Sequence, residues 1–350
     1  MKELYETCAR LLTGGEDVVT ATIISQSGSA PRAAGGKMLV RADGSFGGTI
    51  GGGLLEAEVL QTAGEVFRTG RAVVREFNLT GADAASTNMI CGGRLEVLVG
   101  LLSAGDPDNA HICRSIGELL HSRQQGVLLT KLPDPGGDPH PLEQSLLLRD
   151  GRQTGFAIPA AWRDDLVQAR GLRVACRYGG PENVLVEPVN SLGTVYIFGA
   201  GHVSQKLAVL TSLVDFRTVV LDDRAEFAKR ERFPMAEEII VPESMEDCFD
   251  DLSIREDSYV VIVTRGHQHD LTVLSQAIQT DACYIGMIGS ARKRQAVYQG
   301  LRESGISEER LARVHSPIGL KIGAETPEEI AVSIVAQLIQ VRGELLHGQA

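Results

Sequence analysis

Short apolar runs alternate with segments of helical spacing through the second half of this chain. Apolar and β-branched runs occupy 194–198, 218–221, 239–241, 258–263 and 282–288. Runs of this length, bounded by glycine or polar residues, predict buried strands. Strands that alternate with helices are typical of a mostly parallel, doubly wound sheet. The second half is therefore predicted to be a Rossmann-like domain.

The first half has a different pattern, in which strands follow one another and glycine is frequent. Helices are predicted at 1–13, 54–68, 107–123 and 162–170, strands at 17–25, 38–40, 72–78, 94–102, 126–132 and 184–189, and a hairpin at 146–152 from its Asp-Gly pair. This order indicates a glycine-rich, mixed α+β sheet domain. Because 350 residues exceed the size at which one core usually grows, two domains are expected, 1–190 and 193–350.

Charge and hydropathy exclude several classes of partner. The formal net charge is −11 and no basic run occurs, which argues against nucleic acid or an anionic membrane surface. Residues 1–12 alternate charged with apolar positions, unlike a signal peptide, and no stretch is as long as a membrane span. The protein is therefore predicted to be cytoplasmic.

The strand at 194–198 runs into a glycine turn that is typical of a dinucleotide site. Gly199 and Gly201 fill the first two glycine positions, Ser204 stands at the third, and His202 begins the following helix. The first glycine permits the tight turn, and the second lets a pyrophosphate approach the free N–H groups of the helix. The alternative is a doubly wound domain whose turn binds no cofactor.

Other polar residues follow the neighbouring predicted strands. Asp222 and Asp223 stand about twenty residues after the glycine turn, where a carboxylate meets ribose hydroxyls and favours NAD over NADP. Gly289 and Ser290 follow the last predicted strand, and His267 follows the fourth. Ligands of such sheets bind beyond the carboxyl ends of the strands, so these residues are candidates for binding or proton transfer.

A second glycine cluster lies in the first half. Gly51-Gly52-Gly53 precedes a predicted helix, and Arg32 and Lys37 stand in the preceding segment. Clustered glycines let the backbone approach a bound anion, and the two cations would neutralise its charge. A tight corner in a small sheet is the alternative interpretation.

The six cysteines are scattered without metal-site spacing and are expected to be thiols. Cys91 alone lies beside a pair of glycines, where a ligand could approach the sulfur. A thiolate is a soft metal ligand and a nucleophile, although a lone cysteine also serves as a buried filler. His267, His269 and Asp270 have no further ligand at helical spacing, so no metal site is predicted.

Several motifs in this order resemble the XdhC/CoxI family of molybdoenzyme maturation factors. In the first half the resemblance depends on SGSAPR, GGTIGGGLLEAE and CGG, and in the second on FGAGHVS, DDR, GMIGSARKR, HSPIGL and AETPEEIAVSI. Thr264-Arg265 departs from the pattern, in which a histidine follows the threonine. The resemblance extends over nearly the whole chain.

The resemblance implies a protein that binds the molybdenum cofactor, helps a cysteine desulfurase to sulfurate it, and delivers it to an apo-hydroxylase. Gly51-Gly52-Gly53 with Arg32 and Lys37 would then hold the phosphorylated pterin, and Cys91 would approach the metal or its sulfur. The Rossmann-like half would hold a dinucleotide or part of the cofactor. A cleft shared by two half-sites makes a homo-oligomer plausible.

Two other classes of function stay open at this stage. An NAD-dependent oxidoreductase would use Asp222 for the ribose and His267 as the proton donor. A nucleotide-binding regulatory module would bind without turnover. The resemblance favours an accessory protein over an enzyme.

Overall fold

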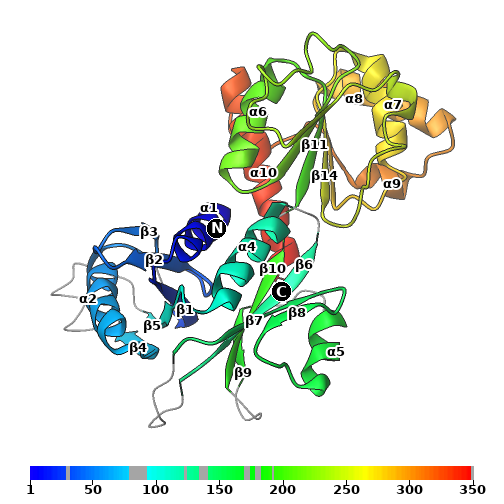
Figure 1. Cartoon of the computed structure of the whole chain (residues 1–350). Coiled ribbons are helices and arrows are strands. Elements are labelled where there is room, and N and C mark those ends of the chain that lie inside the picture. Colours follow the sequence, from blue (N-terminus) through cyan, green and yellow to red (C-terminus); the bar gives the residue numbers. More distant parts are fainter. Residues whose placement is uncertain are drawn as a thin grey trace. The chain divides into compact units, whose positions relative to one another are not determined.

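The computed structural model divides into two compact units, Met1–Asn190 and Ser191–Ala350, which are described separately (Figure 1). It describes residues 1–28, 32–78, 93–121, 124–133, 141–168, 174–177, 183–190 and 193–347.

The first unit contains two five-stranded sheets, and every pair of strands in them is antiparallel. The first sheet has the order β3-β2-β1-β5-β4, and the second has the order β8-β7-β6-β10-β9. The strands of the first are β1 (Val18–Ser27), β2 (Lys37–Arg41), β3 (Phe46–Gly48), β4 (Val73–Asn78) and β5 (Arg94–Leu102). Those of the second are β6 (Gln125–Lys131), β7 (Gln144–Leu148), β8 (Gln153–Gly155), β9 (Ala175–Arg177) and β10 (Val184–Asn190).

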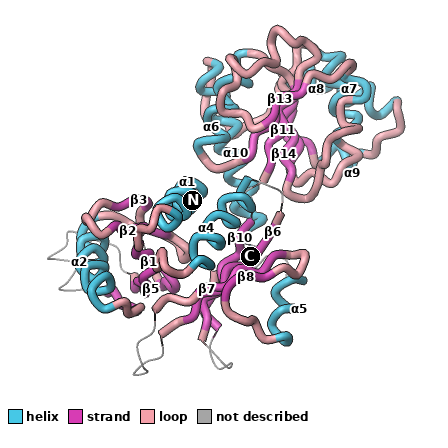
Figure 2. The backbone as a smooth tube through the Cα atoms, viewed as in Figure 1, coloured by secondary structure: helices cyan, strands magenta, loops and turns pink. Residues whose placement is uncertain are grey.

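Helices cover both faces of these sheets (Figure 2). Helix α2 (Gly53–Thr69) packs on the outer face of the first sheet, and α5 (Ala160–Gln168) packs on that of the second. Between the sheets, α1 (Lys2–Thr13) and α4 (Pro107–His121) share one apolar core with both inner faces. The predicted α+β class is confirmed. The strands form two sheets because α4 carries the chain from β5 in one sheet to β6 in the other.

The second unit is built on a six-stranded parallel sheet with the order β13-β12-β11-β14-β15-β16. Its strands are β11 (Thr194–Phe198), β12 (Arg217–Leu221), β13 (Glu238–Ile240), β14 (Ser258–Ile262), β15 (Tyr284–Met287) and β16 (Val314–His315). Numbered along the chain, this is the 3-2-1-4-5-6 arrangement of the Rossmann fold. The Rossmann-like prediction is confirmed.

Two layers of helices enclose this sheet (Figure 1). Helices α6 (His202–Leu213) and α10 (Pro327–His347) pack on one face. Helices α7 (His267–Ala277), α8 (Ala291–Glu303) and α9 (Glu308–Ala312) pack on the other, together with the short 3-10 turn η1 (Met245–Asp247). The two apolar clusters, one on each face, bury the side chains of the central strands β11 and β14 completely.

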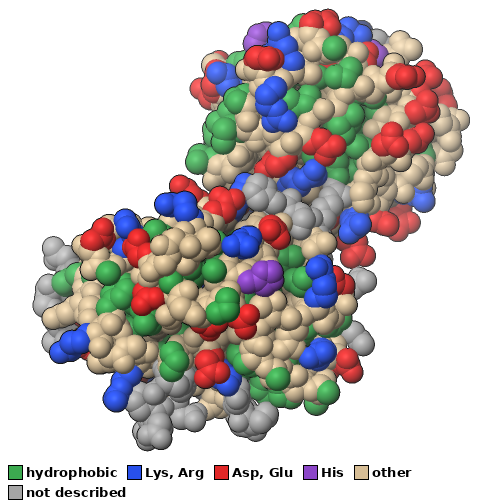
Figure 3. Space-filling view, in the orientation of Figure 1, with side chains coloured by type: hydrophobic (Ala, Val, Ile, Leu, Met, Phe, Trp, Pro, Cys, Tyr) green, Lys and Arg blue, Asp and Glu red, His purple; other side chains and the backbone are tan. Residues whose placement is uncertain are grey.

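The surface carries both signs of charge. Figure 3 shows Lys and Arg side chains interspersed with Asp and Glu over the visible face of both units. Among the described residues, no helix is both long enough and apolar enough to cross a membrane.

Candidate ligand-binding edge of the second unit

The loops that follow β11, β12, β14 and β15 meet at one edge of the second unit, because parallel strands end on the same side of their sheet. We call this edge the carboxyl edge. The sequence-predicted residues that the fold brings there are Gly199, Gly201, His202, Asp222, Asp223, His267, Gly289 and Ser290. His267 is the first residue of α7, and its side chain lies outside the described part of the chain.

Gly199 is required by the packing of the sheet itself. Its φ is 109°, a conformation that favours glycine, and a Cβ there would lie 2.5 Å from the carbonyl oxygen of Val263. The Gly199 N–H donates to the Leu221 carbonyl at 2.7 Å. This glycine therefore lets the loops after β11 and β14 approach each other closely.

Gly201 has a different environment. It is the N-cap residue of α6, with φ −79°, and a Cβ at this position would meet no heavy atom within 4 Å. His202, the next residue, is exposed. The start of α6 is therefore open to an approaching group, as an anion site at a helix N-terminus requires.

Asp222 is enclosed by the glycine turn. The Ala200 N–H donates to its Oδ2 at 2.7 Å, and Arg224 Nε and Nη2 donate to Oδ1 and Oδ2 at 2.8 and 2.9 Å. Its side chain is only 3% exposed. Burial acts to raise the pKa of Asp222, but the hydrogen bonds from Arg224 and Ala200 outweigh it and lower the pKa. The Asp222 carboxylate is therefore held within the glycine turn by hydrogen bonds to Ala200 and Arg224.

Asp223 is the more accessible acid, with 23% of its side chain exposed. Its Oδ2 lies 3.2 Å from Nη2 of Arg265, which connects the loops after β12 and β14. Of the two acids that the sequence suggested for a ribose, Asp223 is therefore the more exposed.

Three arginines gather at this part of the carboxyl edge. The guanidinium groups of Arg224 and Arg232 lie 3.9 and 4.8 Å from the ring centroid of Phe227. Arg265 stands on the next loop and is half exposed. Arg232 lies eleven residues after the end of β12, in a segment of turns, so no periodicity marked it in the sequence. Arg224 and Arg265 are paired with Asp222 and Asp223, whereas Arg232 donates to the Ala200 carbonyl at 3.0 Å and adds positive charge that favours an anionic ligand.

A buried carboxylate lies further along the same edge. Asp270 is fully buried in the first turn of α7, and its Oδ1 accepts a hydrogen bond from the Thr264 hydroxyl at 2.5 Å. The Lys293 ammonium forms an ion pair with its other oxygen. Ser290, the N-cap residue of α8, accepts a hydrogen bond from the Lys293 N–H at 3.3 Å. The sequence singled out Asp270, whereas its lysine partner was missed.

The glycine corner of the first unit is filled by its own chain. Oε1 of Glu56 accepts hydrogen bonds from the Thr49 hydroxyl and from the N–H groups of Ile50 and Gly52, at 2.5, 3.1 and 3.0 Å. Partial burial acts to raise the pKa of Glu56, and these hydrogen bonds lower it on balance. Gly51, Gly52 and Gly53 all have positive φ. The donors of this corner are therefore occupied by the Glu56 carboxylate of the same chain.

The two cations proposed for this corner have separate environments. Arg32 is exposed. The Lys37 ammonium is buried and lies 2.8 Å from Glu187 Oε1, and it donates to the Thr22 hydroxyl at 2.8 Å. Lys37 therefore connects β2 of the first sheet to β10 of the second. Cys91, the proposed sulfur ligand, lies outside the described residues.

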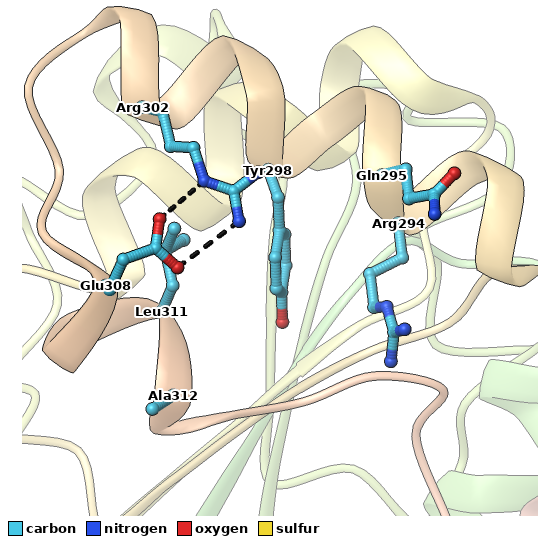
Figure 4. A pocket seen from close by; sticks show the side chains of 7 residues that line it. All are labelled: Arg294, Gln295, Tyr298, Arg302, Glu308, Leu311 and Ala312. Carbon is cyan, nitrogen blue, oxygen red and sulfur yellow. Dashed lines mark hydrogen bonds and ion pairs between the residues drawn. The ribbon is translucent and has the colours of Figure 1, made fainter.

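A hollow of about 450 Å³ lies between α8 and α9, beside β16 (Figure 4). Arg294, Tyr298 and Arg302 line it at four-residue spacing along α8, and Arg302 pairs with Glu308 of α9 at 2.5 Å.

The described residues contain no cluster of three or more potential metal-ligating acids, histidines and cysteines. Among the described residues no disulfide is formed by the cysteines, which are Cys8, Cys113, Cys176, Cys248 and Cys283.

The fold and this edge define a two-unit protein whose second unit is a Rossmann domain with a polar, partly cationic rim. Two family models match the chain: the XdhC Rossmann domain over residues 195–338, and the XdhC and CoxI family over residues 11–78. The chain belongs to the XdhC/CoxI family.

Named relatives support this assignment. A Bacillus subtilis protein described as a probable xanthine dehydrogenase subunit is 27% identical over 95% of each chain. The "Molybdenum cofactor insertion chaperone PaoD" of Escherichia coli is 24% identical over 95% of this chain and 85% of its own length. The "Uncharacterized protein YqeB" of Escherichia coli is 28% identical, but this chain spans only 46% of its length.

A solved structure has the same architecture. A Bacillus halodurans protein described as a xanthine dehydrogenase is 27% identical, with a TM-score of 0.77. The similarity covers 97% of this chain and 95% of that one.

Proposed function

We propose that this protein is a maturation factor for a molybdenum hydroxylase. It binds the molybdenum cofactor, assists its sulfuration by a cysteine desulfurase, and delivers it to an apo-enzyme of the xanthine dehydrogenase type. The observation that carries the proposal is the similarity to an insertion chaperone of that cofactor along nearly the whole of this chain.

The carboxyl edge supports a phosphorylated cargo. The N-terminus of α6 is open at Gly201, and Arg232 and Arg265 place further cations on the neighbouring loops, whereas Arg224 is paired with Asp222. Backbone N–H groups and guanidinium groups are the usual partners of a phosphate. The phosphate end of the cofactor is therefore assigned to the second unit, with Asp223 available for a ribose when the cargo is a dinucleotide.

Cys91 of the first unit is proposed, independently of the carboxyl edge, as the residue that meets the metal or its sulfur during sulfuration. A thiolate suits a metal bound by sulfur, and two glycines follow Cys91 in the sequence. In this role the sulfur contacts the metal or its terminal sulfur while the desulfurase acts. The cofactor itself supplies the redox chemistry, and only after it has reached the hydroxylase.

Small molecules released from protein purified from a cofactor-producing host test the proposal. Mass spectrometry should find the pterin, and its oxidised fluorescent form should approach one equivalent per chain. Cys91→Ala should lower this retention at least about tenfold, which corresponds to the loss of one metal or charge-assisted contact. Cys176→Ala, a half-buried cysteine elsewhere in the first unit, is the matched control and should retain the pterin.

Two results would contradict this proposal. NAD as the sole bound molecule, together with NADH-dependent turnover, would support the oxidoreductase alternative. Full pterin retention by folded Cys91→Ala would remove Cys91 from the site.

A further inference from the structure

The ion pair of Asp270 and Lys293 is the most unusual charged group at the carboxyl edge. Asp270 is 0% exposed, and burial of a carboxylate is costly even when a partner is present. Replacement of such pairs by apolar residues is often neutral or stabilising. A buried ion pair is therefore weak evidence of a stabilising role. A buried acid with a specific partner at a ligand edge is more typical of a functional site.

Three separate loops and helices contribute to this group. Thr264 follows β14, Asp270 lies in the first turn of α7, and Lys293 lies in the first turn of α8. Because β14 and β15 are neighbours in the sheet, the segments that follow them lie side by side. The pair is therefore part of the edge itself.

The backbone is shaped to hold Lys293 in place. A Cβ at Gly289 would lie 2.9 Å from Cδ of Lys293, so glycine at this position leaves space for the lysine stem. Ser290 Oγ accepts the Lys293 N–H and fixes the start of the helix. These contacts direct the stem toward Asp270.

The two partners differ in exposure. The Lys293 side chain is 23% exposed, whereas Asp270 is sealed. An ammonium group has three N–H donors, and Asp270 occupies only part of this capacity. The remaining donors of this partly exposed side chain are the ones proposed for an anion that binds at the edge.

We propose that Lys293, oriented by Asp270, binds a phosphate group of the ligand at the carboxyl edge. Asp270 is a positioning residue, held in turn by the Thr264 hydroxyl. This inference depends on the proposed function only in taking the cargo to be phosphorylated, and it places a phosphate at Lys293, three strands along the sheet from the arginines at Phe227.

Titration of the full-length protein with inorganic pyrophosphate at fixed ionic strength tests this assignment. Lys293→Met should weaken pyrophosphate binding about tenfold or more, the effect of losing one charge-assisted hydrogen bond. Arg292→Met removes the neighbouring exposed cation and is the matched control. It should change the affinity less than twofold.

A double variant separates binding from stability. Lys293→Met alone leaves Asp270 buried without its cation, so a loss of folding would mask the result. Asp270→Asn/Lys293→Met removes both charges and should melt close to the wild type, yet still bind pyrophosphate about tenfold more weakly. Asp270→Asn alone keeps the ammonium but loses its orientation, and should weaken binding by an intermediate factor.

Wild-type affinity in the double variant would overturn the proposal, as would wild-type protein that binds no pyrophosphate. Pterin content of the same proteins distinguishes the two proposals. Lys293-dependent pyrophosphate binding by protein that never carries pterin would refute the maturation role and leave this assignment intact.

Discussion

The two glycine turns of this protein look alike in sequence but use their backbone donors differently. In the first unit, Glu56 fills the corner of Gly51-Gly52-Gly53 and is held by N–H and hydroxyl donors. In the second, Asp222 accepts one N–H of the turn and is neutralised by Arg224. Gly201 then leaves the start of α6 open.

The basic side chains near the two turns also differ in their exposure to solvent. Lys37 points into the first unit and pairs with Glu187, whereas Arg265 and Lys293 stand at the rim of the second unit with part of each side chain exposed. Glycines with nearby basic residues therefore predict an anion site only when the fold leaves both accessible. In the first turn Gly52 is also open, but its N–H is already taken up by Glu56, so the second turn is the better candidate.

The largest loss in the free energy of unfolding is expected for a substitution at Gly199. Gly199→Ala places a Cβ 2.5 Å from the Val263 carbonyl oxygen at a φ of 109°. Steric overlap with the backbone and the unfavourable φ should together lower the free energy of unfolding by about 3 kcal/mol or more. Chemical denaturation of the full chain measures this loss.

Gly201→Ala is the matched control. Its φ of −79° suits alanine and its Cβ meets open space, so the free energy of unfolding should change by less than about 0.5 kcal/mol. Equal losses in the two variants would contradict the distinction between a packing glycine and an open one.

An intermediate effect is expected at the buried pair of the first unit. Glu187→Gln leaves the Lys37 ammonium buried without its counter-charge, and should lower the free energy of unfolding by about 3 kcal/mol. Glu143→Gln, which removes a partly exposed partner of Lys131 in the same unit, should cost less than about 1 kcal/mol. Comparable denaturation midpoints for the two variants would show that Lys37 is solvated.

The smallest effect is expected at Glu56, and it depends on pH. The pKa of this carboxyl is lowered from its ordinary value of 4.5, so its contribution is complete above that pH and is lost as the pH falls through the lowered pKa. Glu56→Gln should therefore lower the free energy of unfolding by about 1 kcal/mol at pH 7, a value discounted for partial solvation.

The difference between wild type and Glu56→Gln should close as the pH is taken below 4.5. Denaturation curves across this range measure it. A difference that persists unchanged in acid would mean that the carboxylate is not the anion of the corner.

The spacing of apolar residues was sufficient to predict most of the helices and strands. The glycine-bounded run at 194–198 and the helix that starts at His202 were located to the residue, because a buried parallel strand is continuously apolar. The strands β3, β9 and β16 were missed, since each has only two or three residues and lacks a period.

The site was harder to predict because side-chain partners are set by tertiary contacts. Sequence spacing placed Asp222 at a ribose, but it could not show that Arg224 would take up the carboxylate two residues earlier. Lys37 was expected beside the glycine corner, and its pairing with Glu187 depends on a strand 150 residues later. Local patterns carry no information about such partners.

The Lys37–Glu187 contact also has a consequence for folding during synthesis. The two residues are separated by 150 positions, so on a ribosome that adds about 5–20 residues per second the lysine emerges on the order of ten seconds before its acid. This contact between the two sheets can therefore form only after β10 has been synthesised.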